Sequence, residues 1–386
     1  MRIVQYRPIF VFICIITFVI VLVQVKYTND AKEKRIRIES EGLFRYTQEV
    51  LTHQCHDTIV VTGASILQAE YSKRKSNISF FNDVNNGFKN RPNITHFTNA
   101  SLFNRPIITL FTSFKTDHEM DSEKVLVYKN TLYNWQTLRP HVQLIYFTTE
   151  NSTAGNLMLF DWNIVSISSP LEIKIPAIKD MYLQASKRYT TSWYGYFNGD
   201  ILLTDDILET LEYISNVSDT FQNASILIIG RRINVFKVTY EQVRSQNGIK
   251  ESARSRGSLY EIDAEDYFIT NIFFPWSKIP AFVIGRAGYD NWIVGHARCD
   301  LKTIVIDATE TLTAVHQTTS KGGNKEGHAH RNNKYNFELI RKLRLPKRFL
   351  QGLTTCAEWR TFRTLKTGRI ELVRRDDLHK NCKCTK

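Results

Sequence analysis

The chain has 386 residues, of which 42% are hydrophobic and 12% aromatic. Wholesale disorder is therefore excluded, and the chain is long enough for one large α/β domain or two smaller ones. The formal net charge of +13 fits either a soluble protein with a basic tail or attraction to anionic ligands such as nucleotides and acidic glycans. Nucleic-acid binding is the least favoured explanation of this charge, because other features of the sequence indicate the secretory lumen.

The N-terminal residues predict a membrane anchor. Residues 9–25 are almost uniformly apolar, and a run of about 17 residues is at the lower limit for a helix that spans a bilayer. The run lacks an obvious small-x-small cleavage site, which favours an uncleaved signal anchor over its main alternative, a cleaved signal peptide. The basic residues after the run outnumber those before it and, taken alone, favour the opposite orientation. We expect residues 1–8 to form a cytoplasmic tail and residues 26–54 a charged stem.

Six N-glycosylation acceptor sequences support a luminal body. One Asn-x-Ser/Thr pattern arises easily by chance, whereas six in a chain with a hydrophobic N-terminus favour passage through the secretory pathway. The acceptor asparagines are Asn77, Asn93, Asn99, Asn151, Asn216 and Asn223. Together with the anchor, they predict a single-pass type II protein of the Golgi or endoplasmic reticulum membrane, with its folded domain in the lumen.

The cysteines fit an oxidising compartment. Cys14 lies in the apolar run, and the other five would be luminal, where disulfides persist. Five is an odd number, so one thiol is free or bonds another chain, and the sequence leaves the pairing open. We divide the luminal part into a folded domain of residues 55–345 and a basic, cysteine-containing extension of residues 346–386.

Strand-like and helix-like segments alternate along this domain. Apolar runs predict strands, and apolar residues at helical spacing predict helices. In chain order we expect a strand at 107–112, a helix at 122–135, a strand at 142–147, a helix at 177–192, strands at 194–197 and 226–229 with a helix after 204–206 between them, a helix from 290 to 299, and a strand at 304–308. The alternation predicts an α/β fold with a mixed, mostly parallel sheet flanked by helices and with ligands at the carboxyl ends of its strands.

Asn198-Gly199-Asp200 follows the aromatic strand at 194–197. A carboxylate at the end of a buried strand, beside a glycine that allows close approach, is well placed to hold a hydrated divalent cation, and the cation could bind a diphosphate. The simpler alternative is an Asx turn or a helix-capping carboxylate. The position after a buried strand favours the cation site at Asp200.

Three further positions could complete such a site. Arg232, at the end of the strand at 226–229, could hold phosphate through a forked bond or form part of a solvated basic pair. Asp290, at the start of a predicted helix, could take a proton from an attacking hydroxyl or simply cap that helix. His316, just past the strand at 304–308, could be a metal ligand, although a lone histidine usually is not. Trp292 could stack on a sugar or lie in the core.

The order of these motifs resembles that of GT-A-fold nucleotide-diphospho-sugar transferases, a family of glycosyltransferases, over roughly residues 105 to 340. The resemblance implies a GT-A-like (Rossmann-like) fold and an Asp-x-Asp motif that binds Mn²⁺ or Mg²⁺ with the nucleotide diphosphate. Asp200 matches the second acid of that motif, whereas Asn198 departs from the first, which puts metal dependence in question. The resemblance further implies Asp290 as the base of an inverting reaction and His316 as a second metal ligand.

These expectations together describe a glycosyltransferase that moves a sugar from a nucleotide-diphosphate donor to a hydroxyl of a glycan, protein or lipid. The residues expected to bind the donor are Thr112, Asn198, Asp200, Arg232, Asp266, Arg286, Asn291 and Trp292. The alternatives are a catalytically silent, glycan-binding relative and a secretory-pathway glycoside hydrolase that uses two carboxylates. The donor sugar, the acceptor and the oligomeric state cannot be read from the sequence, because pocket shape and loops set them.

Overall fold

The computed structural model describes residues 105–114, 122–149, 162–170, 174–218, 221, 223–320 and 332–384. All of them belong to the unit that spans Phe97–Lys386. The expected tail, anchor and stem (1–54) lie outside the described residues. Among the helices that are described, none is both long and apolar enough to cross a membrane.

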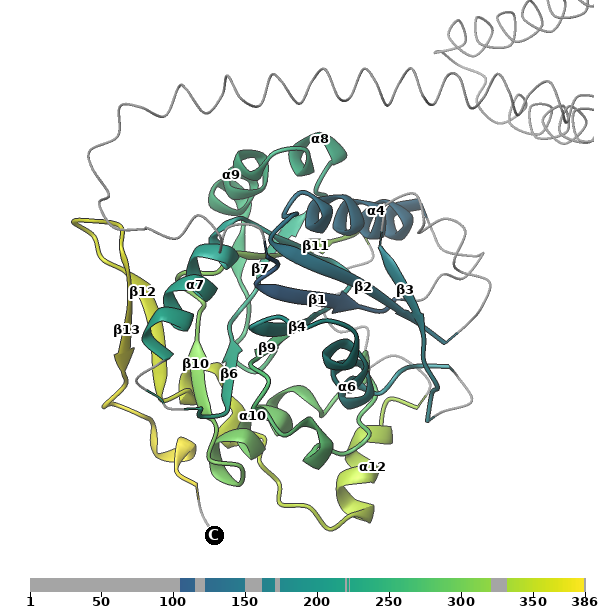
Figure 1. Ribbon diagram of the computed structural model, residues 1–386, viewed down its shortest axis with the longest axis vertical. Helices are drawn as coiled ribbons and strands as arrows, with labels where there is room; N and C mark the ends of the chain where they lie inside the picture. The colour runs from purple at the N-terminus through teal and green to yellow at the C-terminus, as the bar shows by residue number, and fades with distance from the viewer. Residues whose placement is uncertain are drawn as a thin grey trace, which may run out of the picture. The chain divides into compact units, whose positions relative to one another are not determined.

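A mixed sheet forms the centre of the fold (Figure 1). In the described part of the chain it has nine strands in the order β13-β12-β10-β6-β9-β4-β1-β2-β3. The strands are β1 (Ile108–Thr112), β2 (Val142–Thr148), β3 (Asn163–Ser166), β4 (Trp193–Phe197), β6 (Ile226–Ile229), β9 (Tyr267–Thr270), β10 (Ile304–Asp307), β12 (Trp359–Arg363) and β13 (Ile370–Arg374). Only β9, against β4 and β6, and β13, against β12, pair antiparallel within this described sheet. The predicted mixed, mostly parallel sheet is therefore confirmed.

Helices cover both faces of this large sheet. On one face lie α4 (Ser122–Gln136) and α7 (Asp206–Ser218), and on the other lie α6 (Ile178–Arg188), α10 (Asp290–Cys299) and α12 (Tyr335–Lys342). Successive residues of β1 serve the two faces: Leu110 belongs to the same core cluster as Trp135 of α4, whereas Phe111 packs edge-to-face on Tyr182 of α6. A sheet buried on both faces explains the nearly continuous apolar runs of its strands.

The expected elements agree with the structure, with one correction on α4. The strand at 226–229 and the helix at 290–299 have the predicted bounds, and the other predicted strands and helices occur with shifts at their ends. Of the apolar residues that helical spacing places on one face of α4, Leu132 and Trp135 are buried, whereas Val125 and Tyr128 are half-buried. The buried residues of α4 also include Asn130, Thr131 and Asn134, because these side chains hydrogen-bond a second sheet.

This second, small sheet was not predicted. Its strands have the order β5-β11-β7-β8 within the described residues, and they are β5 (Ile201–Leu203), β7 (Ile233–Phe236), β8 (Ser258–Leu259) and β11 (Ala314–Thr318). The helices α8 (Tyr240–Val243) and α9 (Gln246–Arg256) lie beside it (Figure 1). Asn134 bonds both the amide and the carbonyl of Leu203, and the Trp135 indole donates to the Ile201 carbonyl. Polar groups of α4 thus fix β5 in place.

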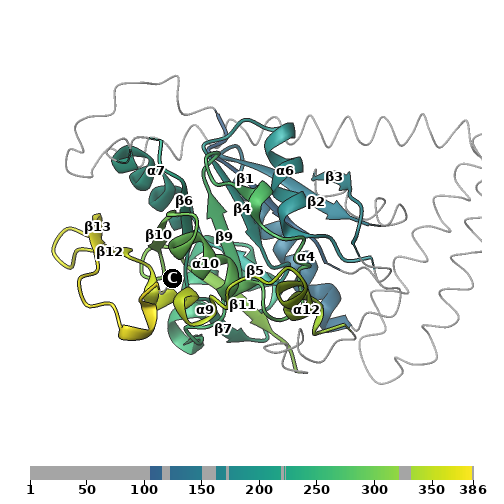
Figure 2. The same ribbon diagram turned by 90° about the horizontal axis from the view of Figure 1, so that it is seen from below.

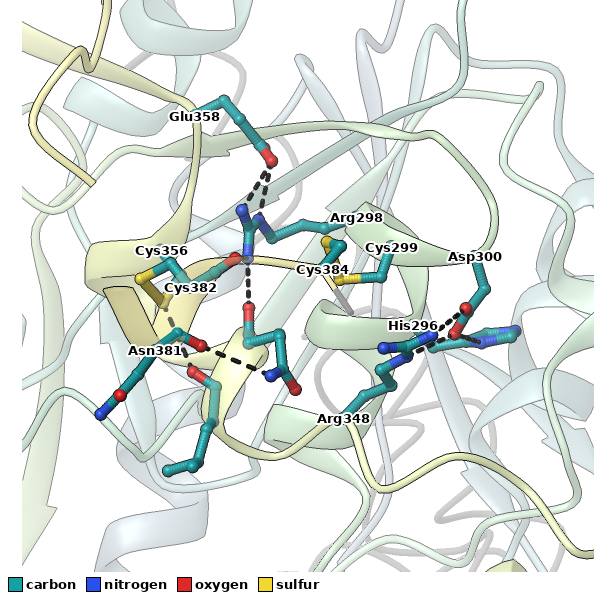
Figure 3. Close-up of a disulfide and its surroundings, with 12 residues drawn as sticks. His296, Arg298, Cys299, Asp300, Arg348, Cys356, Glu358, Asn381, Cys382 and Cys384 are labelled. Atoms are coloured by element: carbon teal, nitrogen blue, oxygen red, sulfur yellow. Dashed lines mark hydrogen bonds and ion pairs between the residues drawn. A yellow bond between two sulfur atoms is a disulfide. The ribbon is translucent and has the colours of Figure 1, made fainter. Parts of the chain in front are cut away.

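The C-terminal residues complete the large sheet and are cross-linked to it. Figure 2 shows β12 and β13 at the opposite end of the sheet from β3. Disulfides join Cys299 at the end of α10 to Cys384, and Cys356 to Cys382 (Figure 3). The short 3₁₀ helices of the fold are η5 (Trp276–Lys278), η6 (Leu350–Gly352), η7 (Thr354–Cys356) and η8 (Lys380–Cys382). All four cysteines of the described residues are paired, whereas Cys55 lies outside them.

Candidate functional site

Three polar side chains meet at one edge of the large sheet. Asp200 follows the carboxyl end of β4, and Arg232 follows the carboxyl end of the parallel strand β6. The third residue is Asp266. Because β9 runs antiparallel between β4 and β6, the start of β9 lies at this same edge, and the backbone N–H of Asn198 donates to the backbone carbonyl of Asp266 at 2.9 Å. The sheet topology therefore explains why residues so far apart in sequence come together.

His316 enters the site from the small sheet. It does not lie past a strand, as expected, but inside β11, where it pairs with Ile201 of the antiparallel strand β5. Its Nε2 lies 3.2 Å from Oδ2 of Asp200. Asp200 stands at the junction of the two sheets, since it separates β4 from β5. This juxtaposition of Asp200 and His316 matches the pair of metal-ligand residues that the sequence suggested.

Asp200 is held as a carboxylate with an unsatisfied oxygen. Burial alone would raise its pKa, but the nearby His316 and the positive charge of Arg232 outweigh burial and lower the pKa below its ordinary value. Oδ1 of Asp200 is buried and has no hydrogen-bond partner within the described part of the chain. Such an atom is costly unless an ion or water satisfies it.

The side chains of Asp200 and His316 fit a divalent cation whose other ligands are water or phosphate oxygens. Two ligands of one six-coordinate ion with bonds of about 2.1 Å lie about 3 Å apart, which is close to the spacing of Asp200 and His316. The described residues contain no group of three or more His, Cys, Asp or Glu side chains arranged for a metal. Asn198 is not a third ligand as it stands, because Tyr196 donates to its Oδ1 and its Nδ2 donates to Asp266.

Arg232 and Asp266 form a buried ion pair beside Asp200. Arg232 Nη1 lies 2.5 Å from Asp266 Oδ1, and the guanidinium lies over the Tyr260 ring at 4.1 Å. Burial raises the pKa of Asp266 even though the charge of Arg232 opposes this. Asp266 Oδ2 is buried and has no partner among the residues described. The pair therefore places a buried positive charge beside Asp200 and leaves one carboxyl oxygen of Asp266 without a hydrogen bond in the described chain.

Asp290 is the first residue of α10, and its side chain is half-buried. Burial raises its pKa to about 7, and the negative charges of Asp266 and Asp263 also raise it. A hydrogen bond from the backbone N–H of Asn291 acts in the opposite direction. A carboxyl group with a pKa close to neutral can both accept and release a proton at physiological pH. Asp290 thus has the protonation behaviour expected of a general base.

The other residues expected to bind the donor are not part of the Asp200–His316 and Arg232–Asp266 pairs. Thr112 ends β1, and its buried hydroxyl has no partner in the described chain. Asn291 bonds Glu265, and Arg286 donates to the Gly285 carbonyl while burial lowers its pKa. Trp292 is fully buried and its indole donates to the Pro346 carbonyl, so its faces are not available to a sugar.

Gly199 has a structural role that the sequence did not reveal. A Cβ at this position would lie 2.6 Å from the Phe114 ring, so the close approach that glycine permits is used by Phe114, from the loop after β1. The Phe114 ring in turn stacks on Tyr128 of α4 at 4.1 Å. The bend that presents Asp200 is therefore packed against an aromatic side chain of the same chain.

Gln317 and Glu265 belong to the site but were not predicted. The Gln317 backbone amide and side-chain Nε2 both donate to the Asp200 carbonyl, at 3.1 and 3.3 Å, and Asn130 donates to its side-chain oxygen. The available signal was the polar pair Asn130 and Asn134 on the buried side of α4, because buried amides require partners. Glu265 is next to Asp266 and is 2% exposed.

The expected glycosylation sites are only partly described. Asn216, near the end of α7, and Asn223 are exposed. The other four acceptor asparagines lie outside the described residues. Exposure satisfies a necessary condition for glycosylation at Asn216 and Asn223, so these two sites stay predictions.

Comparisons with known proteins identify no family for this chain. No protein-family model matches it, and no curated protein matches it. Among solved structures, S. aureus TarS 1–349 in complex with UDP-GlcNAc has a TM-score of 0.33 and 11% identity, over 65% of this chain and 71% of that one. CMP:2-keto-3-deoxy-manno-octonic acid synthetase complexed with CTP has a TM-score of 0.27 and 10% identity, over 62% of this chain and 98% of that one. Similarities of this size carry no argument about function, which must rest on the chain's own residues.

Proposed function

We propose that the chain is a glycosyltransferase with a GT-A-like fold that transfers a sugar from a nucleotide-diphosphate donor to an acceptor hydroxyl. The observation that carries this proposal is the meeting of the Asp200–His316 pair with the Arg232–Asp266 pair at the carboxyl edge of the sheet, close enough to Asp290 for Asp266 to influence its pKa. Ligands of mostly parallel α/β sheets bind at this edge.

Asp200 and His316 would hold Mn²⁺ or Mg²⁺, with the remaining positions open to donor phosphate and water. When bound, the ion supplies positive charge that stabilises the leaving nucleoside diphosphate. Arg232 adds a second positive charge, although Asp266 already occupies one edge of its guanidinium. Asp266 Oδ2, which has no hydrogen bond in the described chain, can accept one from a hydroxyl group of the nucleotide sugar.

Asp290 would act as the general base. Its carboxylate takes the proton of the acceptor hydroxyl while the hydroxyl oxygen forms a bond to the anomeric carbon. The bond from that carbon to the diphosphate breaks, and the diphosphate leaves with the electron pair. Attack from the side opposite the leaving group inverts the anomeric centre. Because the pKa of Asp290 is about 7, a large fraction is ionised at neutral pH.

The proposed setting is the lumen of the Golgi or endoplasmic reticulum, with residues 9–25 as a type II anchor. The two disulfides support an oxidising compartment, where such bonds persist. The acceptor would then be a glycan, glycoprotein or glycolipid of the secretory pathway.

A silent, glycan-binding protein is the second candidate function. It is supported by Asn198, which stands where the resembling family has its first acid and whose side chain is engaged by Tyr196 and Asp266. Among the described residues at this edge of the sheet, Asp200 and His316 are then left to hold a cation. Donor binding without turnover would identify this case.

Calorimetric titration of the full-length chain with a panel of nucleoside diphosphates, each with and without Mn²⁺, tests the proposal. We expect one nucleotide to bind in a metal-dependent way and Asp200→Asn to abolish that binding. Asp205→Asn is the matched control, because Asp205 is an exposed carboxylate five residues away that pairs with Lys250. If the folded protein binds none of the nucleotides, the transferase proposal is wrong.

A further inference from the structure

A buried glutamate joins the candidate site to the C-terminal part of the chain. Glu265 Oε2 accepts a hydrogen bond from Asn291 Nδ2 at 2.9 Å, and Glu265 Oε1 lies 3.0 Å from Thr354 Oγ1. Asn291 is the second residue of α10, and Thr354 begins η7. Glu265 therefore bridges the first turn of the helix that carries Asp290 and the segment that the Cys356–Cys382 disulfide anchors.

The backbones around this bridge are in close contact. A Cβ on Gly352 would lie 1.7 Å from the Asn291 carbonyl oxygen, and a Cβ on Gly295 would lie 2.1 Å from the Arg348 carbonyl oxygen. Glycines at both positions thus let η6 pack directly on α10. The backbone N–H of Asn291 also donates a hydrogen bond to the Asp290 carboxylate, so any displacement of Asn291 moves a partner of Asp290.

The surroundings of Glu265 disfavour a negative charge. The acidic groups near it are Asp290 on α10 and Asp263 and Asp266 on its own segment, and burial with these charges raises its pKa well above the ordinary value. No cation forms an ion pair with Glu265 among the residues that the structure describes. Arg375, which donates to the Thr354 carbonyl, pairs with Asp307 instead. Burial, three neighbouring acidic groups and the lack of a cation partner in the described chain all favour the neutral form of Glu265.

The hydrogen bonds accommodate the extra proton. The Thr354 hydroxyl has a single proton and two acceptors within reach, Glu265 Oε1 and the Ile262 carbonyl oxygen at 3.1 Å. A protonated Glu265 can donate to Thr354 Oγ1 while Thr354 donates to Ile262, and the other carboxyl oxygen still accepts from Asn291. Each donor in this arrangement has its own acceptor.

We infer that Glu265 is a positioning residue: as a neutral carboxylic acid it bridges Asn291 and Thr354 and so fixes the first turn of α10, which carries Asp290. The inference that this serves catalysis rests on the proposed transferase function. A neutral bridge holds Asn291 without adding a further negative charge beside Asp290. The pKa of the general base therefore stays close to neutral pH.

Infrared spectroscopy of the full-length chain tests the protonation state without any substrate. The spectrum is taken at a pH well above the pKa of about 7 of Asp290, so that Asp290 is ionised. We expect the wild-type spectrum to contain the carbonyl stretching band of a protonated carboxyl group. The Glu265→Gln variant should lack this band. Glu261→Gln, which changes an exposed carboxylate in the same segment, should leave the band intact. A band that is absent from the wild type or that survives Glu265→Gln overturns the inference.

Kinetics test the positioning role. Glutamine presents one acceptor and one donor, like a carboxylic acid, so Glu265→Gln should keep the acid limb of the wild-type pH profile of kcat. Glu265→Ala should lower kcat by about 10²-fold, the scale of a small misplacement of a catalytic group, with little change in donor KM. An acid limb displaced to lower pH in Glu265→Gln would mean that Glu265 is ionised, which overturns the inference.

The two failures can be distinguished. If neither wild type nor variants transfer sugar, but the infrared band behaves as expected and Glu265→Ala increases hydrogen exchange in the first turn of α10, Glu265 still positions that turn and only the transferase function is lost. If transfer is observed but exchange and kcat are unaffected by Glu265→Ala, the function stands and the positioning role is wrong. Should Glu265→Ala fail to fold, Thr354→Val removes the other half of the bridge and is measured in the same way.

Discussion

The large and small sheets of this protein are held in place by different mixtures of contacts. The large sheet is buried on both faces by apolar side chains of five helices in the described chain, whereas the small sheet combines a smaller apolar cluster with buried hydrogen-bonded amides, chiefly Asn134 and Gln317. Apolar packing tolerates small shifts, but a network of paired amides has one arrangement that satisfies all its members. The candidate site lies where the two sheets meet, and its two proposed metal ligands are held by the amide network.

The largest expected effect concerns the chemistry at this junction and leaves both sheets intact. Asp290→Asn should lower kcat by about 10²- to 10⁴-fold, the usual contribution of a general base, while donor binding and the folded structure are retained. Steady-state kinetics with circular dichroism check this. Full activity in a folded Asp290→Asn variant would break the assignment of the base.

A core substitution in the large sheet should affect stability without affecting the junction. Ile228 in β6 is fully buried, and Ile228→Ala should lower the free energy of unfolding by about 2–5 kcal/mol. Ile272→Ala is the control, since Ile272 is 57% exposed and should change stability little. Urea denaturation measures both variants. The donor affinity of the folded Ile228→Ala protein should match that of the wild type, and a large loss of affinity would show that the two sheets are not independent.

Two amides of the small-sheet network allow a sharper comparison. Asn134→Ala removes the side-chain partner of the Leu203 amide and carbonyl, and Gln317→Ala removes the acceptor of Asn130 and one of two donors to the Asp200 carbonyl. Each substitution should cost about 1–3 kcal/mol of stability. Gln317 also bonds the Asp200 carbonyl, whereas the Asn134 side chain bonds Leu203. We expect only Gln317→Ala to weaken metal-dependent nucleotide binding at matched loss of stability. Equal weakening by both variants would indicate that the network acts as one unit.

A last expected effect is a pH dependence of stability at the junction. The pKa of Asp290 is about 7 in the folded chain against 3.8 for an ordinary aspartate, so the folded state binds more protons between these values. Stability from this group is therefore full below the lower value and is lost as the pH rises through the folded pKa. Asp290→Asn should remove this decline, so that its Tm relative to wild type rises from acid to neutral pH. A constant difference in Tm would contradict the raised pKa.

The sequence predicted the strands β1, β2, β4, β6 and β10 of the large sheet because they are apolar runs that differ clearly from the amphipathic helices between them, whereas β3, β9, β12 and β13 of the same sheet were not predicted. The strand at 226–229 and the helix that begins at Asp290 had their observed bounds. The small sheet escaped prediction because the positions of its strands are specified by partners far away in the sequence, such as Asn134 for β5. Single-segment patterns do not contain that information.

The candidate site was predictable where a polar residue directly follows a strand, as at Asp200 and Arg232. The sequence placed His316 with Asp200, and the two side chains do lie together. The location of His316 inside β11 depends on pairing with β5, which no local pattern reveals. Trp292 shows the opposite failure, since its neighbourhood of acidic and aromatic residues suggested a binding surface whereas its indole fills the core. Glu265 was overlooked because its partners, Asn291 and Thr354, lie 26 and 89 positions away along the chain.

The bridge from Glu265 to Thr354 also bears on the order in which the chain matures during synthesis. Residues up to β11 can fold as the ribosome delivers them, but β10 gains its neighbour β12 only after Trp359–Arg363 has emerged. Thr354 and the cysteine partners of Cys299 and Cys356 arrive at the same late stage. The Asp200–His316 pair can therefore form early, whereas the helix that bears the proposed base is secured last. Under the proposed function, the donor site of a nascent chain would be assembled before its general base is held in position.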